Sequence, residues 1–233
     1  MNQYLPHIAY DSVVLGFSGE ELKILIMEYH NTGLFALPGG FVRTDEDLDS
    51  AVRRGLHERT GLSEIFLEQF HTFGDVARFK PEVMEAILKA NNHDVPANYW
   101  MKQRFISVAY YALINYNDVI PKPDALSDSC RWYNVDNLPR LILDHKGIVE
   151  KAIDTLRQNI HRKVVGVNLL PEKFTMNELQ KVYEKIMGQS MRRTTFQRTM
   201  LATDMLERHE KRFTGGAHKA PYLYSFRQAD KSR

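Results

Sequence analysis

The stretch from residue 39 to residue 62 carries charged residues at a spacing that could bind a metal ion or a phosphate group. Apolar residues at helical spacing predict a helix from Asp47 to Thr60, on which positions three and four residues apart are neighbours. Positions 55, 58 and 59 share one face of this helix and hold Gly, Glu and Arg. A single carboxylate is a poor site for a divalent cation, which needs several oxygen ligands, and the permanent charge of Arg59 repels that cation. The sequence therefore predicts that metal-assisted hydrolysis at this face is very weak or absent.

The same stretch resembles the Nudix box, G-x5-E-x7-R-E-U-x-E-E-x-G-U, in which U is a bulky aliphatic residue. Seven positions agree in register, namely Gly40, Glu46, Arg54, Leu56, Glu58, Gly61 and Leu62. Gly55 and Arg59 stand where the pattern has glutamates. In Nudix hydrolases these carboxylates hold Mg²⁺, so the resemblance implies a domain that recognises a nucleotide without cleaving it, with no catalytic residue and no metal site. The alternative is an accidental match, in which a helix simply follows a Gly-Gly turn.

Length and composition describe an ordinary globular chain. Its 233 residues leave room for one large domain or two modest ones. The single Cys130 excludes an intrachain disulfide framework and indicates a reducing compartment. No apolar run approaches the length of a membrane span, and the first ten residues lack the basic and apolar parts of a signal peptide. We therefore expect a cytoplasmic protein without a membrane partner.

Charge is distributed unevenly along the chain. Residues 173–233 hold 13 Lys and Arg against 6 Asp and Glu, whereas residues 1–172 hold 18 against 23. A basic C-terminal quarter attached to an acidic body indicates a polyanionic partner.

The first 160 residues alternate between strand and helix patterns. Strands are predicted at 8–17, 22–29, 66–73 and 105–113, with a short strand starting at Arg131 and a helix at 148–157. For Pro38-Gly39-Gly40 we predict a turn whose glycines allow positive φ and close backbone approach. Gly61 is expected to end the box helix in the left-handed conformation. These elements predict an α+β chain whose first domain is an α/β/α sandwich, as expected for a Nudix fold.

Residues 77–103 interrupt this pattern with a long insertion. It contains a short amphipathic helix, with Val83, Ile87 and Leu88 as its apolar residues, and a loop with Tyr99 and Trp100. Two interpretations stay open. The insertion is either a surface excursion whose aromatic residues fold back for burial, or a flap over a ligand pocket whose rings are available to stack on a base.

A small helical domain is predicted after Lys163. Thr175 and Glu178 form a T-x-x-E capping box for a helix at 176–187. The tight turn at 188–190 leads to a second helix, expected from Met191 to about Leu206. Residues 208–219, which include a Gly-Gly pair, and the strand at 222–226 have the pattern of a β-hairpin. Helix, turn, helix and ribbon together predict a winged helix-turn-helix.

The second helix of this domain carries side chains suited to reading DNA. Arginine can bind guanine bidentately, glutamine can bind adenine, and threonine can contact a phosphate or a thymine methyl group. The candidate DNA-binding residues are Arg192, Arg193, Thr194, Thr195, Gln197 and Arg198 on the helix, and Lys211, Arg212, His218 and Lys219 on the wing. The alternative is a solvated basic face on a helical appendage, but the turn, the side-chain mixture and the wing together favour DNA.

Taken end to end, the chain resembles the NrtR-type Nudix-related transcriptional regulators of NAD metabolism. The resemblance rests on the degenerate box, on FGDVAR…QRFISVAYYALI (73–78 and 103–114), on GVNLLPEKFTMNELQKVYEKI (166–186) and on the basic helix that follows. It implies a Nudix-like effector domain at 1–162, a linker at 163–172 and a winged helix-turn-helix at 173–233. It also implies a homodimeric repressor of NAD-metabolism genes that binds double-stranded, palindromic operator DNA, with ADP-ribose as effector and no cofactor.

In such a regulator ADP-ribose would lie against the Gly39-Gly40 turn and the box helix, and Arg54 or Arg59 would pair with its pyrophosphate. The candidate effector-binding residues are Gly39, Gly40, Arg54, Glu58, Arg59, Arg78, Gln103 and Arg104. For Arg54, an ion pair with Glu58 four residues on is an equal alternative. Two other functions stay open: a sugar-responsive (arabinose-like) regulator of the same fold, and a residual Mg²⁺-dependent ADP-ribose pyrophosphatase that uses Glu46 and Glu58.

Overall fold

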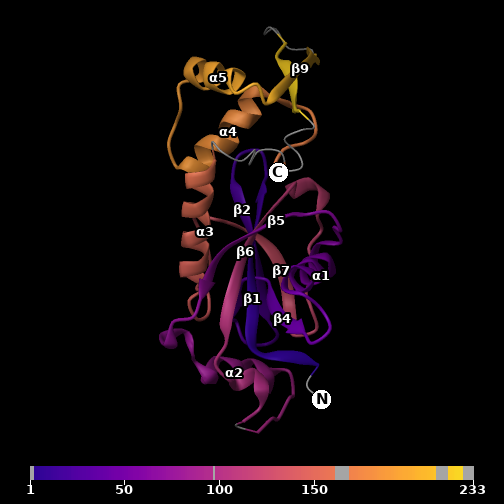
Figure 1. Ribbon diagram of the computed structural model, residues 1–233, viewed down its shortest axis with the longest axis vertical. Helices are drawn as coiled ribbons and strands as arrows, with labels where there is room; N and C mark the ends of the chain where they lie inside the picture. Colours follow the sequence, from indigo (N-terminus) through magenta and orange to yellow (C-terminus); the bar gives the residue numbers. More distant parts are fainter. Residues whose placement is uncertain (1–2, 97, 161–167, 214–219, 228–233) are drawn as a thin grey trace.

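The computed structural model describes residues 3–96, 98–160, 168–213 and 220–227. A mixed sheet with helices on both faces forms the larger domain, and a smaller helical domain with a ribbon lies at one end (Figure 1). Helix α2 lies at the opposite end of the molecule from α5 (Figure 1). Within the described ranges, no helix combines the length and the apolar character needed to cross a membrane.

In the described part of the chain, seven strands form the main sheet. They are β1 (Tyr4–Phe17), β2 (Leu22–Tyr29), β3 (Phe35–Ala36), β4 (Gly39–Arg43), β5 (Phe66–Phe73), β6 (Ile106–Ile114) and β7 (Ser127–Asn134). The order is β3-β2-β1-β6-β5, with β4 added on β1 and β7 on β2. The β1–β6 pair is parallel, from Ile8 opposite Ile106 to Gly16 opposite Ile114, and the other pairs are antiparallel. The predicted strands are present, although β1 begins at Tyr4 and β7 at Ser127, earlier than expected.

Two helices cover the two faces of this sheet. On one face, Val14 of β1 packs in a core cluster with Val52 and Leu56 of α1 (Leu48–Thr60). On the other, Val13 and Leu15 share a cluster with the buried residues of α3 (His145–Asn159). Because successive side chains of a strand point to opposite faces, β1 supplies both cores. The predicted α/β/α sandwich is confirmed.

The box helix forms as its sequence predicts. The Asp47 carboxylate accepts a hydrogen bond from the Ser50 backbone N–H at the start of α1, and Gly61 closes the helix at φ 75°. The predicted turn at Gly39-Gly40 is wrong, because both glycines lie in β4 without positive φ and pair with β1. Their close approach is confirmed: a Cβ on Gly40 would lie 2.6 Å from the Tyr10 hydroxyl oxygen.

The insertion and the loops contain short helices. They are the 3-10 turn at Val76–Arg78, α2 (Pro81–Ala90), the 3-10 turn at Trp100–Lys102 and a third at Tyr116–Asp118. Ile87 and Leu88 are buried, which confirms the predicted amphipathic helix of the insertion.

The smaller domain contains β8 (Phe174–Thr175), α4 (Met176–Met187), α5 (Arg193–Ala202), β9 (Leu206–Lys211) and β10 (Tyr222–Phe226), with the strand order β8-β10-β9. Both hydrogen bonds of the predicted capping box form between Thr175 and Glu178. The second helix is shorter than predicted: it starts at Arg193 and stops at Ala202, because Asp204 takes φ 57° and Leu206 already lies in β9. The expected hairpin tip at 214–219 lies outside the described residues.

The two domains share one continuous apolar core. Leu179, Val182 and Phe196 of the smaller domain belong to the same cluster as the α3 face of the sheet. The Arg157 guanidinium on α3 donates to the carbonyl of Ile186 near the end of α4, at 2.7 Å. The predicted linker at 163–172 is described only from residue 168, and its Leu169 and Leu170 are buried in this core.

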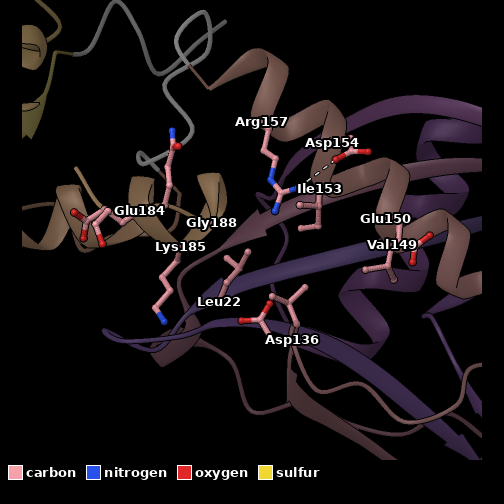
Figure 2. Close-up of a pocket in the computed structure, with 13 residues that line it drawn as sticks. Leu22, Asp136, Val149, Glu150, Ile153, Asp154, Arg157, Glu184, Lys185 and Gly188 are labelled. Carbon is pink, nitrogen blue, oxygen red and sulfur yellow. Dashed lines mark hydrogen bonds and ion pairs between the residues drawn. The ribbon is translucent and has the colours of Figure 1, made fainter.

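A cavity of about 760 Å³ lies beside this junction. Figure 2 shows Glu150 and Arg157 of α3, Lys185 of α4 and Leu22 of β2 around it. Among its polar residues, Arg157 pairs with Asp154 of the same helix and also donates to the carbonyl of Ile186 in α4. We therefore assign this cavity to the contact between the domains.

Candidate functional site

A second cavity, of about 250 Å³, lies beside β4, α1 and α2 in the larger domain. Its wall is largely apolar and aromatic, as is typical of small-molecule sites. Seven arginine, carboxylate or histidine side chains interrupt that wall, namely Asp11, Arg54, Glu58, Arg59, Arg78, Asp124 and His145. Three arginines thus face three carboxylates and one imidazole inside one cavity.

Six of the eight candidate effector residues line this cavity, namely Gly39, Gly40, Arg54, Glu58, Arg59 and Arg78. Gln103 and Arg104 do not line it. Gln103 lies in a smaller neighbouring cavity under α2, and the exposed Arg104 donates to the carbonyl of Gly74 at 2.7 Å. The structure therefore gathers most of the predicted set and separates these two residues from it.

The guanidinium of Arg59 is engaged by protein acceptors in the middle of the box. Its Nη2 donates to the Gly39 carbonyl at 3.0 Å and to Asp124 Oδ2 at 2.7 Å, and its Nη1 donates to the Gly55 carbonyl at 2.8 Å. The residue is only 6% exposed. A buried cation paired with Asp124 thus stands at the position that a glutamate has in the resembled box.

Tyr10 occupies the space next to Gly55. A Cβ at position 55 would overlap the Tyr10 hydroxyl oxygen and lie 3.1 Å from its ring Cζ. The side chain of Tyr10 is buried, and this burial raises the pKa of its phenol. A carboxylate side chain at position 55 therefore has no room unless Tyr10 moves.

Arg54 is held by Glu46 rather than mainly by Glu58. Its Nε and Nη2 bind the two carboxylate oxygens of Glu46 at 3.0 and 2.6 Å, and Nη2 also donates to the Phe41 carbonyl. The predicted alternative, a pair with Glu58, is present at 3.5 Å as a longer contact to a half-exposed side chain. The Arg54 guanidinium holds the pKa of the Glu46 carboxyl below its usual range.

Arg78 lies at the centre of a buried polar cluster. No motif in the sequence predicts the partners of Arg78 in this cluster. Its Nε and Nη2 bind the two oxygens of Asp144 at 2.9 and 3.2 Å, and Nη1 donates to the Phe105 carbonyl. Asp11 lies 3.5 Å from Nη2 and accepts a hydrogen bond from Ser107 at 2.6 Å. The two carboxylates are 66 or more positions away from Arg78 in the sequence, so no local spacing could have paired them with it.

His145 completes this cluster at the start of α3. Its Nδ1 accepts a hydrogen bond from the backbone N–H of Leu37 at 3.0 Å. The proton of the neutral ring is therefore on Nε2, which lies 3.6 Å from Asp11 Oδ1. Asp11, Asp124, Asp144 and His145 are, with Tyr10, residues of the site region that sequence reasoning missed.

The insertion lines the cavity with apolar residues, whereas its predicted stacking rings, Tyr99 and Trp100, do not line it. Met84 and Ile87 of α2 and Met101 line the cavity, as a flap would. Trp100 instead folds back, stacking on Tyr4 at 5.3 Å between ring centroids and meeting Phe41 edge-on at 4.7 Å. The predicted burial of the aromatic residues is thus confirmed for Trp100, and of the flap interpretation only the position beside the cavity is found.

Among residues 3–96, 98–160, 168–213 and 220–227, no three carboxylate, imidazole or thiol groups gather closely enough to hold a metal ion. Glu58, the remaining acidic residue of the box helix face, is 51% exposed in its side chain and faces Arg54.

The other candidate surface is the outer side of α5. Arg192, Arg193, Thr194, Thr195 and Arg198 are exposed, and Gln197 is partly exposed. Phe196 and Met200 lie between them and are buried against α4. Within the described chain, the three arginine side chains form no ion pair, so their charge remains available to a partner.

The wing residues are more constrained. Arg212 is paired with Glu178 at 3.2 Å, and the ammonium of Lys211 lies over the ring of Tyr222 at 5.2 Å from its centroid. His218 and Lys219 lie outside the described residues.

Two family models match the chain. The NUDIX domain model matches residues 5–154, and the model of the NrtR DNA-binding winged helix domain matches residues 166–226. A curated relative, the ADPR responsive transcriptional repressor NtrR of Acinetobacter baylyi, is 26% identical over 232 residues, covering 97% of this chain and 84% of that protein.

Solved structures give the same result. The crystal structure of Shewanella oneidensis NrtR has a TM-score of 0.73 at 27% identity and covers 97% of this chain and 96% of that one. The same protein complexed with a 27mer DNA has a TM-score of 0.72 at 28% identity and covers 94% and 93%. Over nearly its whole length, the chain is therefore similar to a transcriptional repressor and to a protein that has been crystallised with DNA.

Proposed function

Since the chain belongs to the NUDIX domain family and continues into a region that matches the NrtR winged helix, we propose that it is a DNA-binding transcriptional repressor that senses ADP-ribose. The winged helix binds operator DNA of NAD-metabolism genes, and the Nudix domain binds the effector beside β4 and α1. The observation that carries the proposal is the similarity over 97% of the chain to the ADPR responsive repressor. A homodimer on a palindromic operator in the cytoplasm is part of this proposal.

The surface of α5 supports the DNA-binding part. Its arginines are exposed and unpaired in the described chain, and its threonines and Gln197 offer hydroxyl and amide groups beside them. Such a helix can enter a major groove and combine phosphate contacts with base contacts. The match to a structure that contains DNA supports the same assignment.

The face of the box helix that carries positions 55 and 59 supports binding of the effector without hydrolysis. Tyr10 occupies the space of a side chain at position 55, and the buried Arg59 guanidinium stands where a second carboxylate would be. Glu46, which could have replaced them as a ligand, is bound by both nitrogens of the Arg54 fork. A Mg²⁺ ion needs oxygen ligands in a near-octahedral arrangement, and this face offers too few free carboxylate oxygens to supply them.

A gel shift with and without ADP-ribose tests the proposal directly. Duplexes from the upstream regions of NAD-metabolism genes would be titrated with the protein, with a scrambled duplex of equal length as control. We expect retention of the genomic duplex and a change in that retention when ADP-ribose is added. By linkage, the effect cannot exceed the difference in effector affinity between the free and DNA-bound forms. Unchanged retention would remove ADP-ribose as the effector.

Two further experiments distinguish the proposed repressor from a pyrophosphatase and from a sugar-responsive regulator. Incubation with Mg²⁺ and ADP-ribose should release no AMP at a steady rate, and sustained release would identify a pyrophosphatase. Calorimetry with ADP-ribose and with arabinose should give heat for the nucleotide alone, and heat for the pentose alone would identify a sugar-responsive regulator.

A further inference from the structure

A strained segment connects the cavity to α3. Leu143, which lines the cavity, has φ 47°, a left-handed conformation that is costly for a residue with a branched side chain. The next residue, Asp144, is the N-cap of α3, yet its carboxylate accepts no hydrogen bond from the helix. Aspartate is among the best N-cap residues, so this arrangement needs a cause.

Comparison with the other helix starts identifies that cause in the backbone. Asp47 and Thr175 cap their helices with ψ near 168° and 156°, whereas Asp144 has ψ 14°. Extended ψ is the usual conformation of a capping residue, because it directs the side chain back toward the free N–H groups. Asp144 is thus held in a conformation that cannot cap.

Arg78 holds it there. The guanidinium binds both oxygens of Asp144, and no other described residue donates to this carboxylate. The other two arginines of the cavity have partners that are fixed further: Glu46 also binds the backbone N–H of Arg43, and Asp124 also binds Ser127. Of these three carboxylates, Asp144 is therefore the one whose described hydrogen bonds all come from its arginine, so it can move away by breaking the contact with that residue alone.

Building on the proposed function, we infer that Arg78 is the residue that binds the pyrophosphate of the effector, and that the phosphate displaces Asp144 from it. The non-bridging oxygens of a phosphate fit the guanidinium fork as a carboxylate does, and the pyrophosphate, with a charge on each of its phosphates, carries more negative charge in total than one carboxylate. The released Asp144 rotates to extended ψ and caps α3, and Leu143 leaves the left-handed region. The segment thus has two states, and the effector selects the second.

The motion reaches the winged helix through α3. Asp144 lies at the first turn of this helix, and Arg157 in its last turn binds the end of α4. The Tyr183 hydroxyl of α4 also donates to the carbonyl of Ile160, next to the end of α3. A change at the start of α3 therefore acts on the element against which α5 packs.

The first test removes the competing carboxylate. Asp144→Ser cannot pair with Arg78 but can still cap a helix, so ADP-ribose should bind about tenfold more tightly by calorimetry, the worth of one charge-assisted hydrogen bond. Asp47→Ser makes the same substitution at the N-cap of α1, outside the cavity wall, and should change affinity by less than about twofold. Equal or weaker binding by Asp144→Ser would overturn the exchange of partners.

The second test addresses the strained residue. Leu143→Gly and Leu143→Ala both remove the side chain, but only glycine relieves the left-handed strain of the unliganded state. The glycine variant should therefore bind ADP-ribose roughly fivefold more weakly than the alanine variant. Equal affinities would show that Leu143 keeps its conformation on binding, and the inference would fall.

A third measurement needs no ligand. The amide hydrogens of Lys146 and Gly147, at the second and third positions of α3, should exchange more slowly in unliganded Asp144→Ser than in the unmodified protein, because serine caps them. Unchanged exchange would overturn the inference even if ADP-ribose binds. If the unmodified protein does not bind ADP-ribose, the proposed function fails, while this exchange measurement still decides the two-state segment.

Discussion

The cavity and the outer face of α5 each present three arginines, but in opposite conditions. Arg54, Arg59 and Arg78 are all bound by carboxylates within their own domain. Those of α5 are exposed and form no ion pair with any described residue. The same residue type thus stabilises the protein in one region and is left available to a partner in the other.

Solvation explains the difference. A buried guanidinium that lacks a counterion costs several kcal/mol, so an arginine inside the domain requires a carboxylate partner. An exposed guanidinium remains hydrated and gains little from a surface carboxylate, so it can be kept unpaired for a polyanion. An anionic ligand must therefore replace a carboxylate in the cavity, whereas DNA needs to displace only water and counterions from α5.

The largest expected effect comes from Arg59. Replacing it with Met leaves Asp124 without its buried partner, so the free energy of unfolding should fall by about 3–5 kcal/mol in urea denaturation. Arg193→Met on α5 should change it by less than about 0.5 kcal/mol, because nothing in the described chain is paired with that residue. A similar loss for both variants would remove the distinction between the two regions.

Gly55 should show the next largest effect on stability. Gly55→Ala places a methyl group against the Tyr10 hydroxyl, and overpacking of this kind costs about 1–3 kcal/mol. Tyr10→Phe removes the overlapping oxygen, so the double variant should recover part of the loss. An additive result in this cycle would mean that Tyr10 does not exclude side chains from position 55.

The arginines of α5 should affect DNA binding and not folding. Arg192→Ala and Arg198→Ala should each weaken operator binding by about 1–3 kcal/mol and relax sequence preference if they contact bases. Lys219→Ala on the predicted wing should mainly flatten the salt dependence of binding. Equal effects at all three positions, visible only in the salt dependence, would argue against base reading by this helix.

Local signals in the sequence were sufficient for some of these elements and not for others. The box helix and the helix after Thr175 carry their own caps, so they form where the sequence places them. The helix predicted to reach Leu206 stops at Ala202, because the apolar spacing continues into a strand and conceals the break at Asp204. Gly-Gly in β4 looked like a turn, but it allows close packing against Tyr10.

Most of the correctly predicted site residues belong to the box, and Arg78 is the exception. Arg54 and Arg59 belong to the same short motif, so their place at one site could be inferred from the box that they share. The partners Asp124 and Asp144 come from loops far along the chain, and only the tertiary fold brings them to the arginines. Sequence reasoning therefore identified the cations of the cavity and missed Asp124 and Asp144, the carboxylates that neutralise Arg59 and Arg78.

The smallest expected effect concerns the pH dependence of one such pair. Since Arg54 lowers the pKa of Glu46 in the folded protein, the ionised carboxylate stabilises the fold above the unfolded pKa of glutamate, about 4.3. This stability is lost as the pH falls through the lowered folded value. The difference in unfolding free energy between the unmodified protein and Glu46→Gln should therefore be largest near neutral pH and shrink below about pH 4.

Glu20→Gln is the matched control for this measurement. Glu20 is exposed in the turn between β1 and β2 and has no partner among the described residues, so its substitution should leave the pH profile unchanged. The difference in unfolding free energy between the unmodified protein and Glu46→Gln could instead stay constant across the acid range. Arg54 would then bind the neutral and the ionised side chain of Glu46 equally well. That result would contradict the proposed difference between the two regions, in which carboxylates neutralise the arginines of the cavity and leave those of α5 unpaired.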